Sequence, residues 1–536
     1  MKHGIITSAQ PESTDAGAEM LRMGGNAVDA AMACALTAGV VDPLMTGIAG
    51  FGSLQLYLPK RGVHEVIDFH GKVPGAATST MWQHLIEGET RDGFGFILKG
   101  RVNDLGYQSI TVPGSLKAYF EAHRDYGKLP WKTICGPAIA HAENGWAVRP
   151  HVAYFWSRKD QLGRAPNPDR LRATPAGRRL YCDKDGNPLD IGDVVRNPDL
   201  GRTLRRIADE GADVFYTGDI ARAIDADMKK HGGLLSYDDL KSYKLTRGQP
   251  LRGTYRGYDV VSNPPPGGGI MLLEMLNVLE QFDLASLGHN TAAYIRTVCE
   301  AMKRATSDKD NHVGDPAFVE VPVARLTDKA YAKGLAESIK RGEKHHVTRL
   351  GGNIPEAAQT THVAVVDTEG NAVSMTHSLG MPSGVVTEGL GFMYNGCMGV
   401  FDPRPGRAGS LAPGKSRFSS MCPTTLFKDG ELKLVIGAPG GTQIVMGVMQ
   451  AILNVVDFGM PILDAICAPR FSATSDIIDV TNRISRHTQA ELERDGYTVT
   501  RNPLSYYIAA VHGLLKVGDQ WTGAADPGHD GMALAV

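Results

Sequence analysis

The sequence lacks the features that would place it in a membrane or on a polyanion. No window approaches the roughly 18 consecutive apolar residues of a membrane-spanning helix. The best candidate, residues 30–41, is shorter and is interrupted by polar residues and glycine. The net charge is −2, so no nucleic-acid or membrane-surface partner is expected. The first residues also show neither the apolar region nor the cleavage site of a secretory signal.

Cysteine is scarce, with 7 residues in 536, and no two of them form a CxxC pair. This scattered, odd-numbered set favours reduced thiols and a cytoplasmic location, although a protein whose leader had been removed would look the same. The adjacent pair His345-His346 could bind a metal, but neighbouring side chains rarely face one ion. We therefore expect solvated surface there and no metal site.

The common catalytic and nucleotide-binding motifs are also missing: there is no HExxH, no GxSxG and no P-loop. Gly47-x-x-Gly50-x-Gly52 has the spacing of a dinucleotide fingerprint, which follows a strand and opens a helix. Here a predicted helix and Pro43 precede the glycines and a strand follows them. A nucleotide-dependent oxidoreductase is thus a distant alternative, and no cofactor is expected.

What the sequence does contain indicates a large globular protein. Hydrophobic residues make up 42% and charged residues 21%, which is typical of globular chains. The pattern predicts helices, strands and a charged linker at 341–359. The predicted helices are 14–23, then a buried second helix that Asn26 caps and that includes residues 27–36, and later 270–282 and 442–456. The predicted strands are 53–58, 258–261, 424–428, 432–437 and a hairpin at 361–378.

Gln359-Thr360-Thr361-His362 lies where this linker meets the hairpin. The two threonines can be simple strand formers. A threonine hydroxyl is a poor nucleophile unless a base takes its proton. If the chain breaks before Thr360, the new α-amino group, with a pKa of about 8, can serve as that base. The residues alone leave both interpretations open.

Three other positions carry candidate chemistry. Gly440 and Gly441 precede a predicted helix, so their N–H groups could receive an oxyanion or simply form a tight turn. Ser419-Ser420 could bind the polar end of a ligand or cap a turn. Cys397 could be a nucleophile, but nothing nearby in the sequence lowers its pKa, which favours a structural thiol.

Six motifs together resemble the γ-glutamyltranspeptidases and their cephalosporin-acylase-like and oxamate-amidohydrolase-like relatives. They occur in that family's order, and the resemblance extends from about residue 4 to the end. The motifs are residues 24–31, 263–266, 311–316, 359–362, 419–421 and 439–441.

The resemblance implies an α/β (α+β) fold, a four-layer αββα sandwich of the N-terminal-nucleophile hydrolase type. It also implies that the precursor cuts itself between Gln359 and Thr360. The large subunit 1–359 and the small subunit 360–536 would then form one structural domain, a heterodimer that acts alone or as a dimer of heterodimers.

The same resemblance assigns catalytic roles. Thr360 would be the nucleophile and its amine the base. Ser378 stands where the family has a second hydroxyl that hydrogen-bonds the nucleophile. Gly440 and Gly441 would supply the oxyanion-hole N–H groups.

Departures from the family lie where true γ-glutamyl enzymes hold glutamate. The arginine position has Gln108 and the asparagine position has Gly380. The two amine-binding positions have Cys397 and Val400. An ammonium group against Cys397 and Val400 would be desolvated without a counter-charge, which costs several kcal/mol.

Other departures suggest an open site. The segment 401–419 is shorter than in enzymes with a lid loop, and Asp526-Pro527-Gly528 stands where the family usually has Asp-Pro-Arg. Ser419 and Ser420 could still hydrogen-bond one end of a substrate.

These observations predict a self-processing amidohydrolase or acyltransferase that acts on a small amide whose acyl group is not γ-glutamyl. One alternative is a γ-glutamyl hydrolase that grips glutamate through Arg417 or Arg404. An alternative of another class is an unprocessed, non-catalytic binding protein on the same fold.

Overall fold

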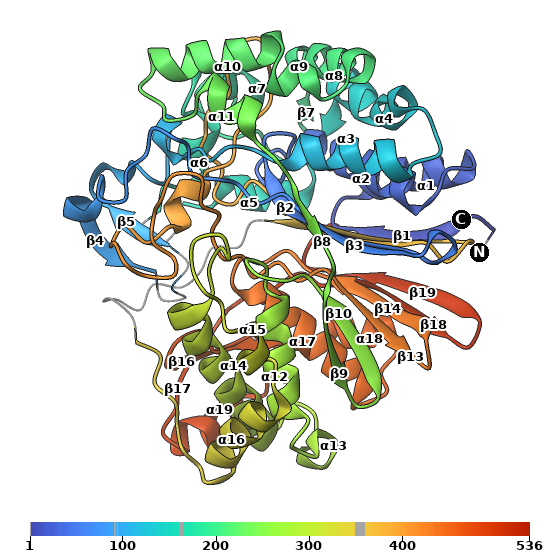
Figure 1. Cartoon of the computed structure of the whole chain (residues 1–536), viewed down its shortest axis with the longest axis vertical. Coiled ribbons are helices and arrows are strands. Elements are labelled where there is room, and N and C mark those ends of the chain that lie inside the picture. The colour runs from blue at the N-terminus through green and yellow to red at the C-terminus, as the bar shows by residue number, and fades with distance from the viewer. Residues whose placement is uncertain (1, 91–92, 94, 160–163, 349–359) are drawn as a thin grey trace.

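The computed structural model describes residues 2–90, 93, 95–159, 164–348 and 360–536 (Figure 1). Gln359 and residues 349–358 of the predicted linker lie outside the described residues. No helix within the described ranges is both long and apolar enough to cross a membrane. None of the seven cysteines, all of which are described, is paired.

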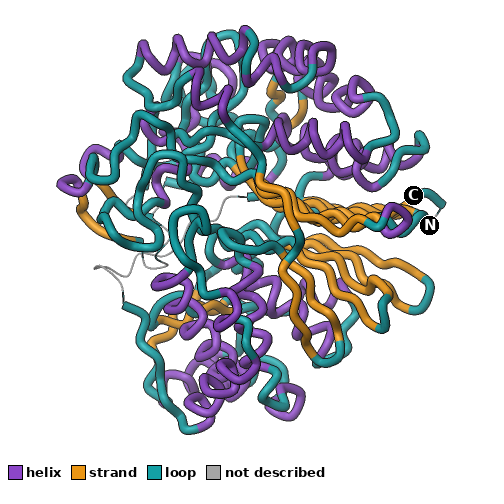
Figure 2. The backbone as a smooth tube through the Cα atoms, in the orientation of Figure 1, coloured by secondary structure: helices purple, strands orange, loops and turns teal. Residues whose placement is uncertain are grey.

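Two antiparallel sheets face each other at the centre of the molecule (Figures 1 and 2). The seven-stranded sheet has the order β20-β1-β11-β12-β2-β3-β8 and the six-stranded sheet the order β19-β18-β14-β13-β10-β9. The strands of the first are β1 (Gly4–Ser8), β2 (Phe51–Leu58), β3 (Val63–Asp68), β8 (Thr246–Gly248), β11 (Thr361–Asp367), β12 (Ala372–Ser378) and β20 (Met532–Ala535). Those of the second are β9 (Leu251–Tyr255), β10 (Tyr258–Ser262), β13 (Thr424–Lys428), β14 (Glu431–Gly437), β18 (His512–Val517) and β19 (Gln520–Ala525).

Helices cover the outer face of each sheet, which confirms the αββα sandwich. α1 (Pro11–Arg22) and α2 (Ala27–Val41) pack on the seven-stranded sheet, and α12 (Gly269–Leu279), α17 (Gln443–Val456) and α18 (Ile462–Cys467) pack on the six-stranded sheet. In Figure 1 the two helical layers lie above and below the pair of sheets.

The remaining elements extend these layers. The upper helices are α3 (Ser115–Tyr126), α4 (Trp131–Asn144), α5 (Pro150–Ser157), α6 (Asn167–Leu171), α7 (Pro175–Tyr181), α8 (Pro198–Glu210), α9 (Asp213–Tyr216), α10 (Asp219–Lys230) and α11 (Tyr237–Ser242). The lower ones are α13 (Leu284–Leu287), α14 (Ala292–His312), α15 (Val323–Leu326), α16 (Lys329–Lys340) and α19 (Arg486–Arg494). Small sheets, which were not predicted, form from β4 (Ile86–Glu89) with β5 (Phe96–Leu98), β6 (Trp146–Ala147) with β7 (Val194–Val195), and β15 (Phe471–Ser472), β16 (Ile477–Val480) and β17 (Thr498–Arg501).

The second predicted helix, α2, forms where its cap indicates. The Asn26 side chain accepts from the N–H groups of Val28 and Asp29, and the Asp29 carboxylate accepts from the Asn26 N–H. This capping box satisfies donors that a helix start leaves unpaired. Every α2 residue except Gly39 is buried, because α2 lies between the sheet and the helices α1 and α4.

The predicted hairpin is confirmed as β11 and β12. Its apolar composition follows because both faces of β11 are buried. Val363 and Val365 pack towards α2 and its neighbours, whereas Ala364 and Val366 face the other sheet. A strand covered on both sides is apolar throughout instead of alternating. This explains the run from Val363 to Val366.

Both sheets combine strands from either side of residue 360. In one sheet β1 lies between β20 and β11, and β12 pairs with β2. In the other sheet β10 pairs with β13. A cut before Thr360 would therefore leave two chains joined through continuous hydrogen-bonded sheets.

Candidate active site

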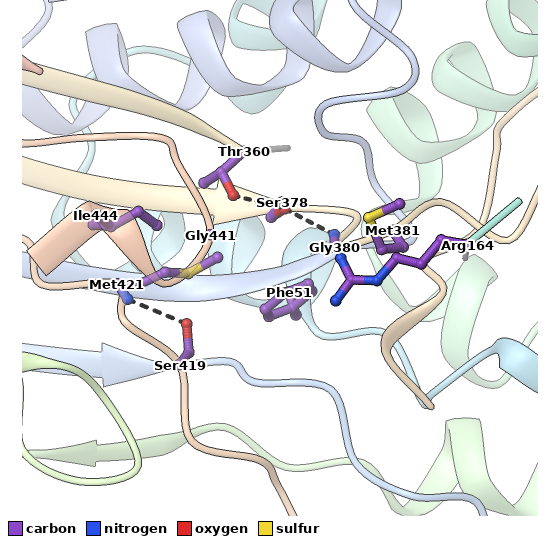
Figure 3. Close-up of a pocket in the computed structure, with 10 residues that line it drawn as sticks. All are labelled: Phe51, Arg164, Thr360, Ser378, Gly380, Met381, Ser419, Met421, Gly441 and Ile444. Atoms are coloured by element: carbon purple, nitrogen blue, oxygen red, sulfur yellow. Dashed lines mark hydrogen bonds between the residues drawn. The ribbon is translucent and has the colours of Figure 1, made fainter. Parts of the chain in front are cut away.

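The register of the hairpin places Thr360 opposite Ser378. Thr361 pairs with His377 across β11 and β12, so one further antiparallel step brings Thr360 to the last residue of β12. The Thr360 hydroxyl donates to the Ser378 Oγ at 3.2 Å (Figure 3). The Ser378 oxygen also accepts the Gly380 N–H at 2.8 Å. The predicted pair of hydroxyls therefore meets at one end of the sheet.

Thr361 takes no part in this pair. Its hydroxyl donates to Gln10 Oε1 at 3.0 Å, and Gln10 in turn donates to Asp42. The two threonines thus differ in their surroundings, because Thr361 belongs to β11 and Thr360 lies just before it.

The glycine-rich turn before β2 positions Ser378. A Cβ on Gly50 would lie 2.4 Å from the Ser378 carbonyl oxygen, and one on Gly39 would lie 2.9 Å from the Gly47 Cα. Only glycine permits these approaches. The turn follows α2 and precedes β2, the reverse of a dinucleotide fingerprint, so its glycines serve packing.

A pocket opens at the two hydroxyls, with about 350 Å³ of space when the solvent at its mouth is included. Gly441 borders it just before α17, while Gly440 does not line it. Gly440 and Gly441 have φ of 144° and 56°, conformations that suit glycine. The residues that line the pocket are Phe51, Arg164, Thr360, Ser378, Gly380, Met381, Ser419, Met421, Gly441 and Ile444 (Figure 3).

The proline-rich corner after β10 holds the serine segment at this pocket. The Ser419 N–H donates to the Pro266 carbonyl at 2.9 Å, and the Met421 carbonyl accepts from Asn263 Nδ2 at 2.9 Å and from the Gly268 N–H at 2.8 Å. Ser419 therefore lines the pocket, with its Oγ accepting the Met421 N–H. Ser420 is buried next to it and lines neither this pocket nor the adjoining one.

The adjoining pocket shares Phe51, Gly380 and Ser419 with the first. Its walls are mostly apolar and include Cys397 and Val400, as the family positions predict. The full lining is Phe51, His70, Gly71, Gly380, Cys397, Val400, Phe401, Arg417, Phe418 and Ser419.

Close packing at Gly380 fixes the shape of this second pocket. A Cβ on Gly380 would lie 2.8 Å from the Cys397 Sγ and 3.3 Å from the Phe51 ring. Gly380 also has a φ of 65°, so a side chain there would be strained. Burial raises the pKa of the Cys397 thiol well above its usual value, which opposes a nucleophilic role.

The charged residues named as alternative glutamate ligands lie at the margin. Arg417 borders the second pocket and donates from Nε to the Val400 carbonyl at 2.6 Å. Arg404 pairs with Asp402 and lines a different cavity, with Glu89.

Gln108 is separate from the site. Its side-chain amide donates to the Gly232 carbonyl at 3.3 Å, and it lines neither pocket. The structure therefore brings together Thr360, Ser378, Ser419, Gly380, Cys397, Val400 and Gly441, but not Gln108.

Phe51, Met381 and Arg164 also line the first pocket, and sequence reasoning missed all three. Phe51 begins β2 opposite Ser378, a position that the strand pattern alone could have located. Arg164 follows α5 in a polar stretch without periodicity, so no local signal marks it.

The side chains of His345 and His346 have separate partners. His345 Nε2 lies 2.8 Å from the Ser307 hydroxyl, and His346 pairs with Asp476 on the surface. Across the ranges that the structure describes, no group of three His, Cys, Asp or Glu side chains could hold a metal.

The chain is similar to known proteins over nearly its whole length. Residues 13–536 match the family described as gamma-glutamyltranspeptidase. The acylase ACY 1 proenzyme of Pseudomonas sp. (strain SE83) is 36% identical over 507 residues, which cover 93% of this chain and 88% of that protein. The glutathione hydrolase proenzyme of Escherichia coli (strain K12) is 34% identical over 556 residues, which cover 98% and 90%. The crystal structure of cephalosporin acylase from Bacillus halodurans has a TM-score of 0.86 at 27% identity and covers 100% of this chain and 96% of that one.

Proposed function

Because the chain belongs to the gamma-glutamyltranspeptidase family, we propose that it is a self-processing amidohydrolase whose nucleophile is the Thr360 hydroxyl. The observation that carries the proposal is the buried Thr360–Ser378 hydrogen bond at the mouth of a pocket. A hydroxyl held in this way at a strand end, beside a cavity, is placed for attack on a bound carbonyl.

Cleavage of the bond between Gln359 and Thr360 turns the Thr360 amide into an α-amine. An amide nitrogen is not a base, whereas an α-amine with a pKa of about 8 accepts a proton near neutral pH. The products are chains 1–359 and 360–536, which the shared sheets hold together as a heterodimer.

The reaction then proceeds by acyl transfer. The Thr360 amine takes the proton of its own hydroxyl while Oγ1 forms a bond with the substrate carbonyl carbon. The Gly441 N–H, which borders the pocket at the positive end of α17, stabilises the oxyanion. The amine returns the proton to the leaving nitrogen as the C–N bond breaks, and water or a second amine then opens the Thr360 ester.

Ser378 orients the nucleophile. Its oxygen accepts the Thr360 hydroxyl and is itself fixed by the Gly380 N–H. This contact limits the rotamers of Thr360, so less conformational entropy is lost on reaching the reactive geometry.

The acyl group proposed here is not γ-glutamyl. Cys397 and Val400 are buried in the wall of the adjoining pocket, and neither can offset the charge of an α-ammonium group. A substrate without that group avoids the desolvation cost of several kcal/mol.

A second candidate is γ-glutamyl hydrolysis with an atypical glutamate site. Arg417 at the edge of the adjoining pocket is the observation that favours it, since a guanidinium can bind an α-carboxylate.

One pair of substrates separates the two candidates. Glutaryl-p-nitroanilide differs from γ-glutamyl-p-nitroanilide only by the missing α-ammonium group. The processed protein, seen as two chains on a denaturing gel, should have the higher kcat/KM for glutaryl-p-nitroanilide. Preference for the γ-glutamyl compound would support the second candidate. One intact chain, inactive on both, would instead indicate a binding protein.

A further inference from the structure

One buried charge in the pocket has no role in the chemistry above. Arg164 lines the pocket together with Thr360 and is 8% exposed. Among the described residues its Nη2 has no hydrogen-bond partner. Figure 3 shows the guanidinium directed towards Gly380, on the same pocket as the two hydroxyls. A side chain buried in this way usually has a partner, so the unpaired Nη2 indicates a ligand that accepts its hydrogen bond.

The residues that follow Arg164 are anchored to the fold through Asp104. The Ala165 N–H donates to the Asp104 carboxylate at 2.6 Å, and Asp104 forms a buried ion pair with Arg170. The guanidinium also packs against the backbone at Gly95, where a Cβ would lie 2.3 Å from Nη2. Asp104 is thus engaged by Arg170 and by the Ala165 N–H.

The other residues that line the pocket cannot offset this charge. Among the described residues the nine others that line it are uncharged: Phe51, Thr360, Ser378, Gly380, Met381, Ser419, Met421, Gly441 and Ile444. A buried guanidinium without a counter-ion is destabilising, and its planar pair of N–H donors matches a carboxylate.

We propose that Arg164 binds a carboxylate of the amide substrate and so determines specificity for anionic amides. This inference rests on the proposed function and names its substrate class: amides that carry a carboxylate but no ammonium group beside it. Arg164 lines the same pocket as Thr360. The carboxylate that it binds can therefore belong to the acyl part of the substrate or to the leaving amine. Either source uses the same contact.

Three matched substrates distinguish these sources. Butyryl-p-nitroanilide is neutral. Glutaryl-p-nitroanilide adds a carboxylate to the acyl chain, and butyryl-3-carboxy-4-nitroanilide adds one to the leaving amine. Activity on each is measured as kcat and KM at low and at moderate ionic strength, because a charge contact weakens as salt increases.

Arg164→Gln removes the charge and keeps a polar side chain of similar reach. It should lower kcat/KM for one of the two anionic substrates by about 10- to 100-fold, mainly through KM, the range expected for a lost charged hydrogen bond. Butyryl-p-nitroanilide should change by less than about 3-fold, within the spread of an uncharged contact. Arg164→Lys should restore part of the loss.

Arg172→Gln is the matched control. Arg172 is exposed and pairs with Asp169 at the surface, so its loss should leave all three substrates unaffected. Equal losses on neutral and anionic substrates in Arg164→Gln, or no loss on either anionic substrate, would overturn the proposal.

Binding separates this inference from the proposed function. Glutarate and benzoate, which carry no amide to cleave, are added to the wild-type protein, and melting is followed. At least one should raise Tm, and Arg164→Gln should abolish that rise. Absence of amidase activity with this shift intact would refute the proposed function alone. Presence of activity without Arg164-dependent binding or selectivity would refute the inference alone.

Discussion

Thr360 Oγ1 donates a 3.2 Å hydrogen bond to Ser378 Oγ across the ends of two neighbouring strands. The strands are held in register by the rest of the hairpin, and Ser378 pairs on its other side with Phe51. The distance between the two hydroxyls is therefore set by three adjacent strands. A rigid sheet positions reactive groups more accurately than a loop does.

Thr360→Ala should abolish both self-cleavage and amidase activity, because both use the same hydroxyl. Thr360→Ser keeps a hydroxyl and an α-amine and should retain part of each activity. A denaturing gel over time and release of p-nitroaniline measure the two effects. Full processing of Thr360→Ala would refute the assignment of the nucleophile.

Thr361→Val tests the difference between the twin threonines. It removes the hydrogen bond to Gln10 and should cost about 1 kcal/mol of unfolding free energy. Self-cleavage should be complete and kcat close to wild type. Denaturant unfolding and the same gel measure this, and loss of processing in a folded Thr361→Val protein would contradict the separation of roles.

Ser378→Ala removes the acceptor of the Thr360 hydroxyl and leaves the Gly380 N–H without its acceptor. The lost hydrogen bond orients the nucleophile and contributes about 1–2 kcal/mol to the transition state. Its loss should lower kcat by roughly 5- to 30-fold with a smaller change in KM. Ser378→Thr retains the hydroxyl and is the control. Equal loss in both variants would indicate a packing effect instead.

Local signals in the sequence predicted much of the framework. Asn26 as a helix cap located the start of α2, and the β-branched run with its turn located the β11–β12 hairpin. Such signals are readable because the interactions involve residues near one another in the chain. The small sheets at 86–98 and 471–501 were not predicted, since short strands carry little periodicity.

The walls of the site were harder to predict because they assemble from distant segments. Arg164 lines the same pocket as Thr360 although the two lie far apart in the chain, with Ala165 held by Asp104 and the guanidinium beside Gly95. Gln108 occupies a family position in sequence, yet the structure directs it to Gly232. Alignment to a motif preserves order along the chain, but it does not fix where a side chain points.

Asp42 should make stability depend on pH. Burial raises its pKa from 3.8 to about 7, against the opposing effects of Arg149 and Gln10. The folded state then binds a proton that the unfolded state releases, so the free energy of unfolding should fall as pH increases through this interval. The slope is at most about 1.4 kcal/mol per pH unit between roughly pH 4 and 7. Asp42→Asn should flatten it, as denaturant unfolding at pH 5 and pH 8 would show. An unchanged slope would contradict this account.

Val400→Asp should move specificity towards γ-glutamyl substrates. Val400 lines the adjoining pocket at 6% exposure, so a carboxylate there would supply the counter-charge that an α-ammonium group lacks. The ratio of kcat/KM for γ-glutamyl- over glutaryl-p-nitroanilide should increase by about tenfold or more, equivalent to roughly 1.4 kcal/mol.

Val400→Asn is the matched control, because it has the same size without the charge and should leave that ratio unchanged. Thermal melting establishes that both variants fold, since a buried carboxylate without a partner is destabilising. An equal increase in both variants would mean that polarity alone admits the ammonium group. No increase in a folded Val400→Asp protein would mean that the α-amine of a bound γ-glutamyl group does not reach this wall.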